Sequence, residues 1–173
     1  PAVEDFAYLG GEASLDADSR STLSTVRGAP RVMYAEVRRL KESALDAAFA
    51  RFMADEWAER TTRAAAFAGY IARERWWLDD YALFEAIADD AGGANWRRWP
   101  SALCDRTPHA LDEARRSLRE DIRRHQYRQW IAASQWQAAR EGLRARHIGI
   151  VGDLPFASSF DSPDVWARQA EYR

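Results

Sequence analysis

The stretch IGIVG, residues 148–152, decides the fold class of this chain. It is a short run of small and β-branched residues without a polar side chain, and it ends at Gly152. This pattern is typical of a strand buried on both faces. One such strand cannot form a sheet alone, because its backbone N–H and C=O groups need partner strands. The sequence therefore predicts a piece of a larger α/β protein whose other strands lie outside these 173 residues.

The sequence before this strand has the spacing of amphipathic helices. From about residue 30, apolar side chains recur every three or four positions, which places them on one helical face. They are Val37, Leu40, Ala44, Ala48 and Phe52. Four further helices are expected, over 58–77, 81–91, 108–118 and 119–146. The chain itself is thus predicted to be mainly α-helical, with about one short buried strand near 148–152.

Caps and breaks refine these limits. Asp79 and Asp80 stand where an N-cap would begin the helix over 81–91. The prolines and tryptophans of 94–108 predict an ordered loop, and Pro163 suits the first position of a last helix that starts near Ser162.

Three parts of the chain follow from this pattern. Residues 1–29 are rich in Gly, Ser and Asp and predict a loop or weakly structured lead-in. Residues 30–146 form a helical region, and 147–173 carry the strand and the loop that follows it.

Composition excludes several functions. With 25 basic and 27 acidic residues, the net charge of −2 gives no field that would attract nucleic acid or an anionic membrane. The single Cys104 cannot form an internal disulfide, and the three histidines have no metal-ligand spacing, so neither a metal nor another cofactor is expected. A reducing, cytoplasmic setting fits this composition. No apolar run is long enough to span a bilayer, and no signal peptide is expected.

The strongest local candidate for chemistry is the acidic loop after the strand. Asp153 follows Gly152 directly, and in α/β barrels the loops after the strands form the active site. An aspartate here is equally typical of a turn whose side chain caps backbone amides. Asp161 and Asp164 could line the same loop, or they could serve as the N-cap and first-turn charge of the last helix.

Other catalytic patterns are missing. The chain has no G-x-S-x-G and no glycine-rich phosphate loop. His125 is expected to be a packed or surface residue of a helix, and His147 a residue at a helix C-terminus, where the helix dipole favours it.

Four segments resemble the 4-α-glucanotransferases (amylomaltases or disproportionating enzymes) of glycoside hydrolase family 77. The segment IGIVGDLPFASSFDSPDVWA, residues 148–167, is similar to the family's strand and loop, which reads D-S-A-D-V-W near its end. The other three are RVMYAEVRRLKESALDAAFARF (31–52), DYALFEAIADDAGGANWRRWPSALCDR (80–106) and HQYRQWIAASQWQAAREGLRARHIGIVGD (125–153). They follow one another in the family's order and cover most of the chain.

The resemblance implies a (β/α)₈ barrel with helical insertions, of which this chain would be an internal fragment. It implies transfer of α-1,4-glucan segments between maltooligosaccharides with retention of configuration, which requires two closely placed carboxyl groups. In the family these carboxylates lie on later strands, so no catalytic residue is expected in this chain. The positions that match the family's loop, and so are expected to bind substrate or support the active site, are Asp153, Pro155, Asp161, Ser162, Asp164 and Trp166.

Two departures from the family's pattern affect the shape of this loop. Serines replace larger groups in FASSF (156–160), and Pro163 stands where the family has alanine.

Three functions are therefore compared. The first is a fragment of a glucanotransferase that is inactive by itself. The second is a non-catalytic glucan-binding or helical interaction module, which exposed, coplanar tryptophan rings would favour; the chain has eight tryptophans. The third is a hydrolase acting on α-glucans. The expected partner is an α-1,4-glucan or maltooligosaccharide, and apolar surface left without the barrel would favour self-association.

Overall fold

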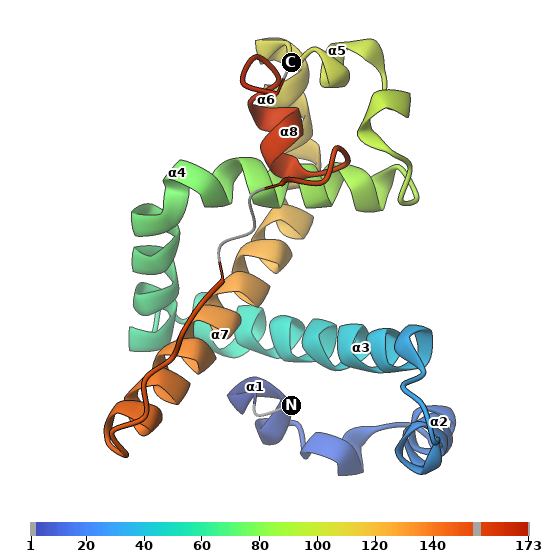
Figure 1. Cartoon of the computed structure of the whole chain (residues 1–173), viewed down its shortest axis with the longest axis vertical. Coiled ribbons are helices and arrows are strands. Elements are labelled where there is room, and N and C mark those ends of the chain that lie inside the picture. The colour runs from blue at the N-terminus through green and yellow to red at the C-terminus, as the bar shows by residue number, and fades with distance from the viewer. Residues whose placement is uncertain (1–2, 154–156, 173) are drawn as a thin grey trace. The chain divides into compact units, whose positions relative to one another are not determined.

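The structure is a computed structural model that describes residues 3–153 and 157–172, and every regular element of these residues is helical (Figure 1). Contacts divide the chain into two compact units, unit 1 (residues 1–66) and unit 2 (residues 67–173). The mainly helical chain expected from the sequence is confirmed. The three-part division remains a prediction.

Unit 1 begins with helices where the sequence predicted a loop or weakly structured lead-in over 1–29. They are α1 (Glu4–Tyr8), the 3₁₀ turn η1 (Gly11–Ser14) and α2 (Ala17–Gly28). The carboxylate of Asp16 accepts a hydrogen bond from the backbone N–H of Ser19 at 2.7 Å. This N-cap starts α2 within a segment whose composition indicated a loop.

The centre of unit 1 is α3 (Tyr34–Phe52), which continues into the π-helical turn η2 (Met53–Trp57). Its buried side chains include three of the expected positions, Ala44, Ala48 and Phe52. Helix α1 packs on α3 and contributes buried Val3 and Phe6, the former from its N-cap. The helical spacing therefore located the inner face of α3 correctly.

Asp5 of α1 is completely buried and is held by two arginines. Its Oδ1 accepts from Arg51 Nη1 at 2.7 Å and from Arg63 Nη1 at 2.8 Å, and its Oδ2 accepts from Arg63 Nη2 at 2.9 Å. Glu56 Oε1 also lies 3.2 Å from Arg63 Nη1. A hydrogen bond from the Thr61 hydroxyl is the largest cause that lowers the pKa of Glu56. The two arginines offset the cost of burying the Asp5 carboxylate. Because they lie on later helices, their contacts with Asp5 also hold α1 to those helices.

Helix α4 (Thr62–Asp90) runs without a break through Asp79 and Asp80, where the sequence predicted an N-cap. The side chains explain the difference. Asp80 Oδ1 accepts from Arg106 Nη2 at 2.6 Å, and Asp79 Oδ2 lies 3.9 Å from Nε of Arg75. Both carboxylates therefore pair with arginines and do not compete for the helix backbone. The predicted helices over 58–77 and 81–91 are one helix.

Unit 2 contains most of α4 and the remaining helices. These are η3 (Trp96–Arg98), α5 (Ser101–Cys104), α6 (Pro108–Ser117), α7 (Arg119–Arg144) and α8 (Pro163–Ala167). Side chains join α4 to α7, with the Phe67 ring 5.3 Å from that of Trp130. The expected helices over 108–118 and 119–146 are confirmed. Their limits differ by no more than two residues.

The predicted strand over 148–152 is wrong for this chain. Helix α7 ends in a turn at His147, which has φ 58° and a backbone N–H that donates to Arg144 O at 3.0 Å. The residues that follow are irregular and solvent-exposed, with exposed fractions of 50% at Ile148 and 98% at Val151. The physical reason is that the part of the chain seen here offers no second strand to accept the backbone hydrogen bonds.

Within 3–153 and 157–172, no helix combines the length and the apolar character needed to cross a bilayer.

Candidate functional site

The candidate site is the loop over 157–169, which contains α8. Its helix starts where the sequence predicted, because Ser162 Oγ accepts a hydrogen bond from the backbone N–H of Val165 at 3.3 Å. Pro163 occupies the first turn, where its missing N–H costs nothing, and Asp164 places a negative charge at the helix N-terminus. Of the alternatives left open for the aspartates, Asp164 is the first-turn charge, and Ser162 is the cap.

Trp166 fixes this loop to the helices of unit 2. Its side chain is completely buried, and its indole N–H donates to Leu103 O at 3.0 Å. Burying a tryptophan removes roughly 150–250 Å² from water, which corresponds to roughly 4–6 kcal/mol of transfer free energy. The loop therefore has one strong attachment point.

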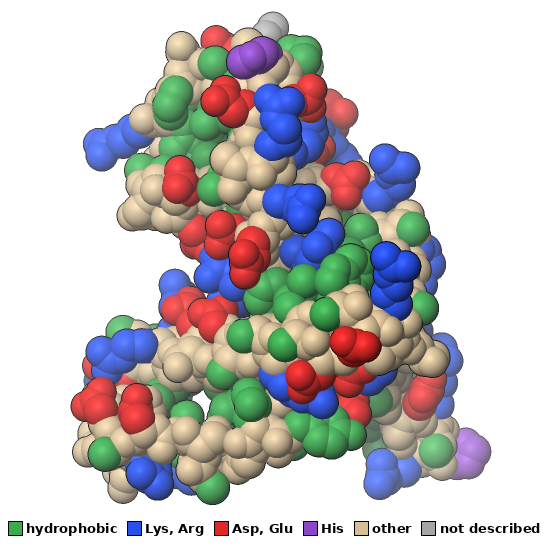
Figure 2. All heavy atoms as spheres, turned by 180° about the vertical axis from the view of Figure 1, so that it is seen from behind, with side chains coloured by type: hydrophobic (Ala, Val, Ile, Leu, Met, Phe, Trp, Pro, Cys, Tyr) green, Lys and Arg blue, Asp and Glu red, His purple; other side chains and the backbone are tan. Residues whose placement is uncertain are grey.

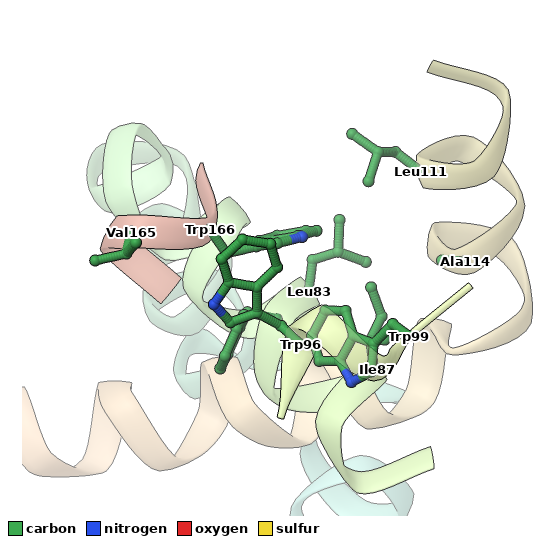
Figure 3. Packing of buried hydrophobic residues seen from close by; sticks show 9 residues of the cluster. Leu83, Ile87, Trp96, Trp99, Leu111, Ala114, Val165 and Trp166 are labelled. Carbon is green, nitrogen blue, oxygen red and sulfur yellow. The ribbon is translucent and has the colours of Figure 1, made fainter. Parts of the chain in front are cut away.

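The surroundings of Trp166 are aromatic (Figure 3). Its ring centroid lies 5.7 Å from Trp99, edge to face, and 5.7 Å from Phe84. The buried cluster comprises Leu83, Phe84, Ile87, Trp96, Trp99, Leu111, Ala114, Val165 and Trp166. Because its members come from α4, η3, α6 and α8, these four elements form one core.

Arg106 covers the remaining face of the indole. Its guanidinium carbon lies 4.1 Å from the ring centroid of Trp166, and its Nη2 binds Asp80. A cation over a tryptophan face is attractive, and the attraction grows where water is excluded. Arg106 thus links α4 to α8.

Polar contacts hold both ends of the loop. The indole N–H of Trp96 donates to Phe160 O at 3.1 Å, and the backbone N–H of Trp96 donates to Asp161 Oδ1 at 3.4 Å. At the other end, Gln169 Nε2 donates to Cys104 O at 2.7 Å. The loop conformation is therefore set by the Trp96–Cys104 segment, a stretch far away in sequence.

The structure brings together four of the six predicted site residues. Asp161, Ser162, Asp164 and Trp166 lie within one cap and one helical turn, with the two aspartates exposed. Asp153 is exposed in the irregular stretch, and it forms no hydrogen bond or ion pair with other residues that the structure describes. Pro155 lies outside the described residues.

The residues that anchor the loop over 157–169 were not predicted from the sequence. Trp96 and Trp99 had been expected to anchor their own loop, and they do, since Trp99 Nε1 donates to Ala94 O at 3.0 Å. Nothing in the sequence indicated that Trp166 would join the rings of Trp96 and Trp99 in one buried cluster. Gln169 and the carbonyl groups of Leu103 and Cys104 have no sequence signal at all.

One set of titratable groups with shifted pKa values lies away from this loop, between α4 and α7. Burial lowers the pKa of His125, and its Nε2 lies 3.0 Å from Asp89 Oδ2, which opposes that shift. Burial also raises the pKa of Glu85, and the nearby charge of Asp89 adds to it. Arg124 Nη2 binds the same Asp89 oxygen at 3.0 Å. These groups join two helices.

The site contains no metal centre in the described part of the chain, since no three His, Cys, Asp or Glu side chains there converge on one point. What the arrangement offers is a loop bound to an aromatic core, with two exposed carboxylates, Asp161 and Asp164.

Several known proteins are similar to this chain. The family model described as 4-alpha-glucanotransferase matches residues 4–173. A 4-alpha-glucanotransferase of Thermus thermophilus is 42% identical over 137 residues, which are 79% of this chain and 27% of that protein. One from Synechocystis sp. is 36% identical over 147 residues, covering 83% of this chain and 28% of that protein. Among solved structures, an amylomaltase from Streptococcus agalactiae in complex with acarbose matches with a TM-score of 0.77 and 28% identity, over 95% of this chain and 32% of that one.

These matches define the class of protein as one related to sugar-transferring enzymes of the amylomaltase type. The chain belongs to the 4-alpha-glucanotransferase family, glycoside hydrolase family 77. It spans between a quarter and a third of the length of these three proteins.

Proposed function

We propose that this chain is part of a 4-α-glucanotransferase that transfers α-1,4-glucan segments between maltooligosaccharides by a retaining mechanism. The observation that carries the proposal is the match of the family model through the loop over 157–169. Retention needs a nucleophilic carboxylate and an acid/base carboxyl about 5 Å apart in the active site. We place both outside these residues, so that the chain alone is inactive.

The loop over 157–169 would then support the substrate site of the whole enzyme. Asp161 and Asp164 expose carboxylate oxygens, which suit hydrogen bonds from sugar hydroxyl groups. Trp166 is buried, so its role is to position these groups and not to stack on a sugar ring. Ser162 caps the helix that follows, and Asp153 and Pro155 would also support the active site, as their match to the family's loop implies.

The segment 148–152 would be a barrel strand in the whole enzyme. Its apolar side chains are exposed here, and its spacing suits a strand covered on both faces. A (β/α)₈ barrel would supply the neighbouring strands. The same exposed side chains favour association of two copies when the barrel is absent.

The alternative of a glucan-binding module has less support. It requires exposed, coplanar tryptophan rings, and the strongly exposed ones are Trp76 at 71% and Trp136 at 54%. They lie on α4 and α7, and among described residues neither ring contacts another aromatic ring. Hydrolysis in place of transfer depends on acceptor contacts outside this chain, and we favour transfer because of the family.

The partners proposed follow from the same facts. An α-1,4-glucan or maltooligosaccharide is the substrate, and the balanced charge supports neither nucleic acid nor a membrane as a partner. The free thiol of Cys104 suits the reducing cytoplasm.

The test is a transfer assay with maltotriose on the 173-residue chain and, in parallel, on the complete enzyme from which it comes. Glucose release and longer oligosaccharides from the complete enzyme, with none from the chain, are expected. Turnover by the chain alone would require Asp153, Asp161 or Asp164 to act as catalytic carboxylates. Inactivity of both proteins towards α-1,4-glucans would reject the proposed activity.

A further inference from the structure

Unit 1 contains an apolar pocket that the proposed function does not use. Its volume is about 220 Å³, and it lies between α2 and α3. Buried Phe6 and Ala44 line its inner part, and five half-buried apolar side chains form the walls. These five are Leu15, Leu23, Val26, Val37 and Leu40.

The pocket exists because α2 packs incompletely on α3. Helix α2 contributes no buried residue, although its Leu23 and Val26 face the pocket. The space-filling view shows an opening bordered by hydrophobic side chains in this unit (Figure 2). Protein interiors are normally close-packed, so a gap of this size between apolar walls leaves dispersion contacts unmade.

The size and lining of the pocket favour a small apolar ligand. A cavity of about 150 Å³ lined by Leu, Ile and Phe stays dry and binds benzene. This pocket is somewhat larger but smaller than the usual site for a drug-sized molecule, about 300–1,000 Å³. A short aliphatic chain fits these limits, whereas a sugar ring would leave its hydroxyl groups without partners.

The mouth of the pocket adds a preference for charge. Glu12 and Arg27 neutralise each other there, with Arg27 Nη1 donating to Glu12 Oε2 at 3.0 Å. Lys41 also lines the pocket, and Arg20 lines an adjoining hollow that shares Glu12 and Arg27. Lys41 forms no ion pair with any residue that the structure describes, whereas the charge of Arg20 acts on the carboxylate of Asp16. After the Glu12–Arg27 pair is discounted, Lys41 is therefore the one charge that remains among the residues described as lining this pocket.

We propose that the pocket between α2 and α3 binds a free medium-chain alkyl carboxylate, with its chain among the walls and its carboxylate at Lys41. Such a ligand satisfies both features at once, because the chain removes apolar surface from water and the carboxylate meets the unpaired ammonium group. The site lies wholly in unit 1 and does not depend on glucan transfer. It joins α2 to α3, so an occupied pocket would hold α2 more firmly.

The test uses octanoate as the probe and follows methyl NMR signals of Leu23, Val26 and Leu40 together with calorimetric titration. Leu40→Trp fills the pocket and should weaken octanoate binding by about tenfold or more. Val26→Phe fills it from the other helix and serves if the first variant fails to fold. Lys41→Gln should weaken octanoate several-fold while leaving the neutral probe octanol unchanged. Arg39→Gln, on an exposed α3 residue outside the lining, is the matched control and should change neither probe.

Three outcomes would overturn the proposal. The first is no octanoate binding at millimolar concentration by the unaltered chain. The second is equal binding by the filled variants, and the third is equal weakening by Lys41→Gln and Arg39→Gln. Binding to phosphatidylcholine–phosphatidylglycerol vesicles without binding of free octanoate would reassign the pocket to a membrane surface. A dimer that Leu40→Trp dissociates, again without octanoate binding, would assign it to a second copy of the chain.

Discussion

The segments 148–151 and Pro163–Ala167 lie close together in the sequence and both carry large apolar side chains, but only the second is buried. Val151 is 98% exposed, whereas Trp166 is completely buried. The difference lies in the backbone. Helix α8 satisfies its own amides with a turn and the Ser162 cap, and it can dock on any suitable apolar surface. An extended segment needs a second strand, which the described chain does not offer.

Burial in this chain therefore depends on how a segment meets its hydrogen-bonding needs more than on how apolar it is. Figure 1 shows both segments after α7, one as an irregular trace and one as a short helix. Four changes test this comparison, in order of decreasing effect.

Replacing Trp166 by Ala should have the largest effect. It removes a fully buried indole and leaves Leu103 O without its donor, so the free energy of unfolding should fall by about 3–5 kcal/mol. Urea unfolding measures this loss. Trp136→Ala, at a ring that is 54% exposed, is the matched control and should cost under about 1 kcal/mol. Equal losses would show that α8 is not anchored as described.

Acidification tests the α4–α7 framework on which α8 docks. The pKa of His125 is lowered in the folded chain, mainly by burial, so the unfolded chain takes up its proton first as pH falls. This contribution to stability is therefore full above the ordinary histidine pKa of about 6.5. It is lost as pH falls below that value towards the folded pKa, at up to about 1.4 kcal/mol per pH unit.

Denaturant midpoints between pH 7 and pH 5 measure this loss. His125→Gln should flatten the profile, whereas His109→Gln, at a histidine whose side chain is 88% exposed, should leave the slope unchanged. If both variants kept the slope of the unaltered chain, His125 would not be the group responsible.

The turn that starts the exposed segment predicts a gain in stability. His147 adopts φ 58°, which favours glycine, so His147→Gly should raise the free energy of unfolding by about 1 kcal/mol. Thermal unfolding detects the change. Gly92→Ala makes the opposite exchange at φ 66° and should lower stability by a similar amount. A loss on His147→Gly would mean that the imidazole contributes contacts the turn requires.

A charge in the exposed segment should have the smallest effect on folding. Val151→Asp removes no buried contact, so stability should change by less than about 0.5 kcal/mol, while any self-association should weaken. Sedimentation velocity and thermal unfolding together test this. Val165→Asp, at a buried position, is the matched control and should be strongly destabilising. Similar losses of stability at both sites would contradict the difference in burial between the two segments.

The sequence predicted those parts of the fold that depend on local signals. The period of α3, the limits of α6 and α7 and the Ser162 start of α8 follow from spacing, proline and cap residues. It failed where distant side chains decide. Asp79 and Asp80 have the composition of a cap, but Asp80 binds Arg106, and the helix continues.

The candidate site was also predicted only where local or family patterns mark its residues. Asp161, Ser162, Asp164 and Trp166 were found through their family pattern, and the local cap explains the arrangement of the last three. The contacts that hold them could not be predicted, because the Trp166 indole donates to a backbone carbonyl of Leu103, 63 positions earlier. Every residue has a backbone carbonyl group, so the sequence does not show which of them accepts a side-chain hydrogen bond. The buried Asp5 was missed for a similar reason, since its arginine partners lie 46 and 58 positions away.

Cys104 is the only thiol in the chain, and it lies half-buried in the segment that holds the loop over 157–169. Its Sγ donates to the carbonyl groups of Trp96 and Trp99 at 3.0 and 3.2 Å, and Gln169 binds its own carbonyl group. Alkylation must break the thiol's hydrogen bonds to Trp96 and Trp99, so its rate depends on how often the segment over 96–104 opens. The molecule thus has a native labelling site, and maleimide kinetics on the unaltered chain would report opening of the segment to which the loop over 157–169 is bound, without an added dye or tag.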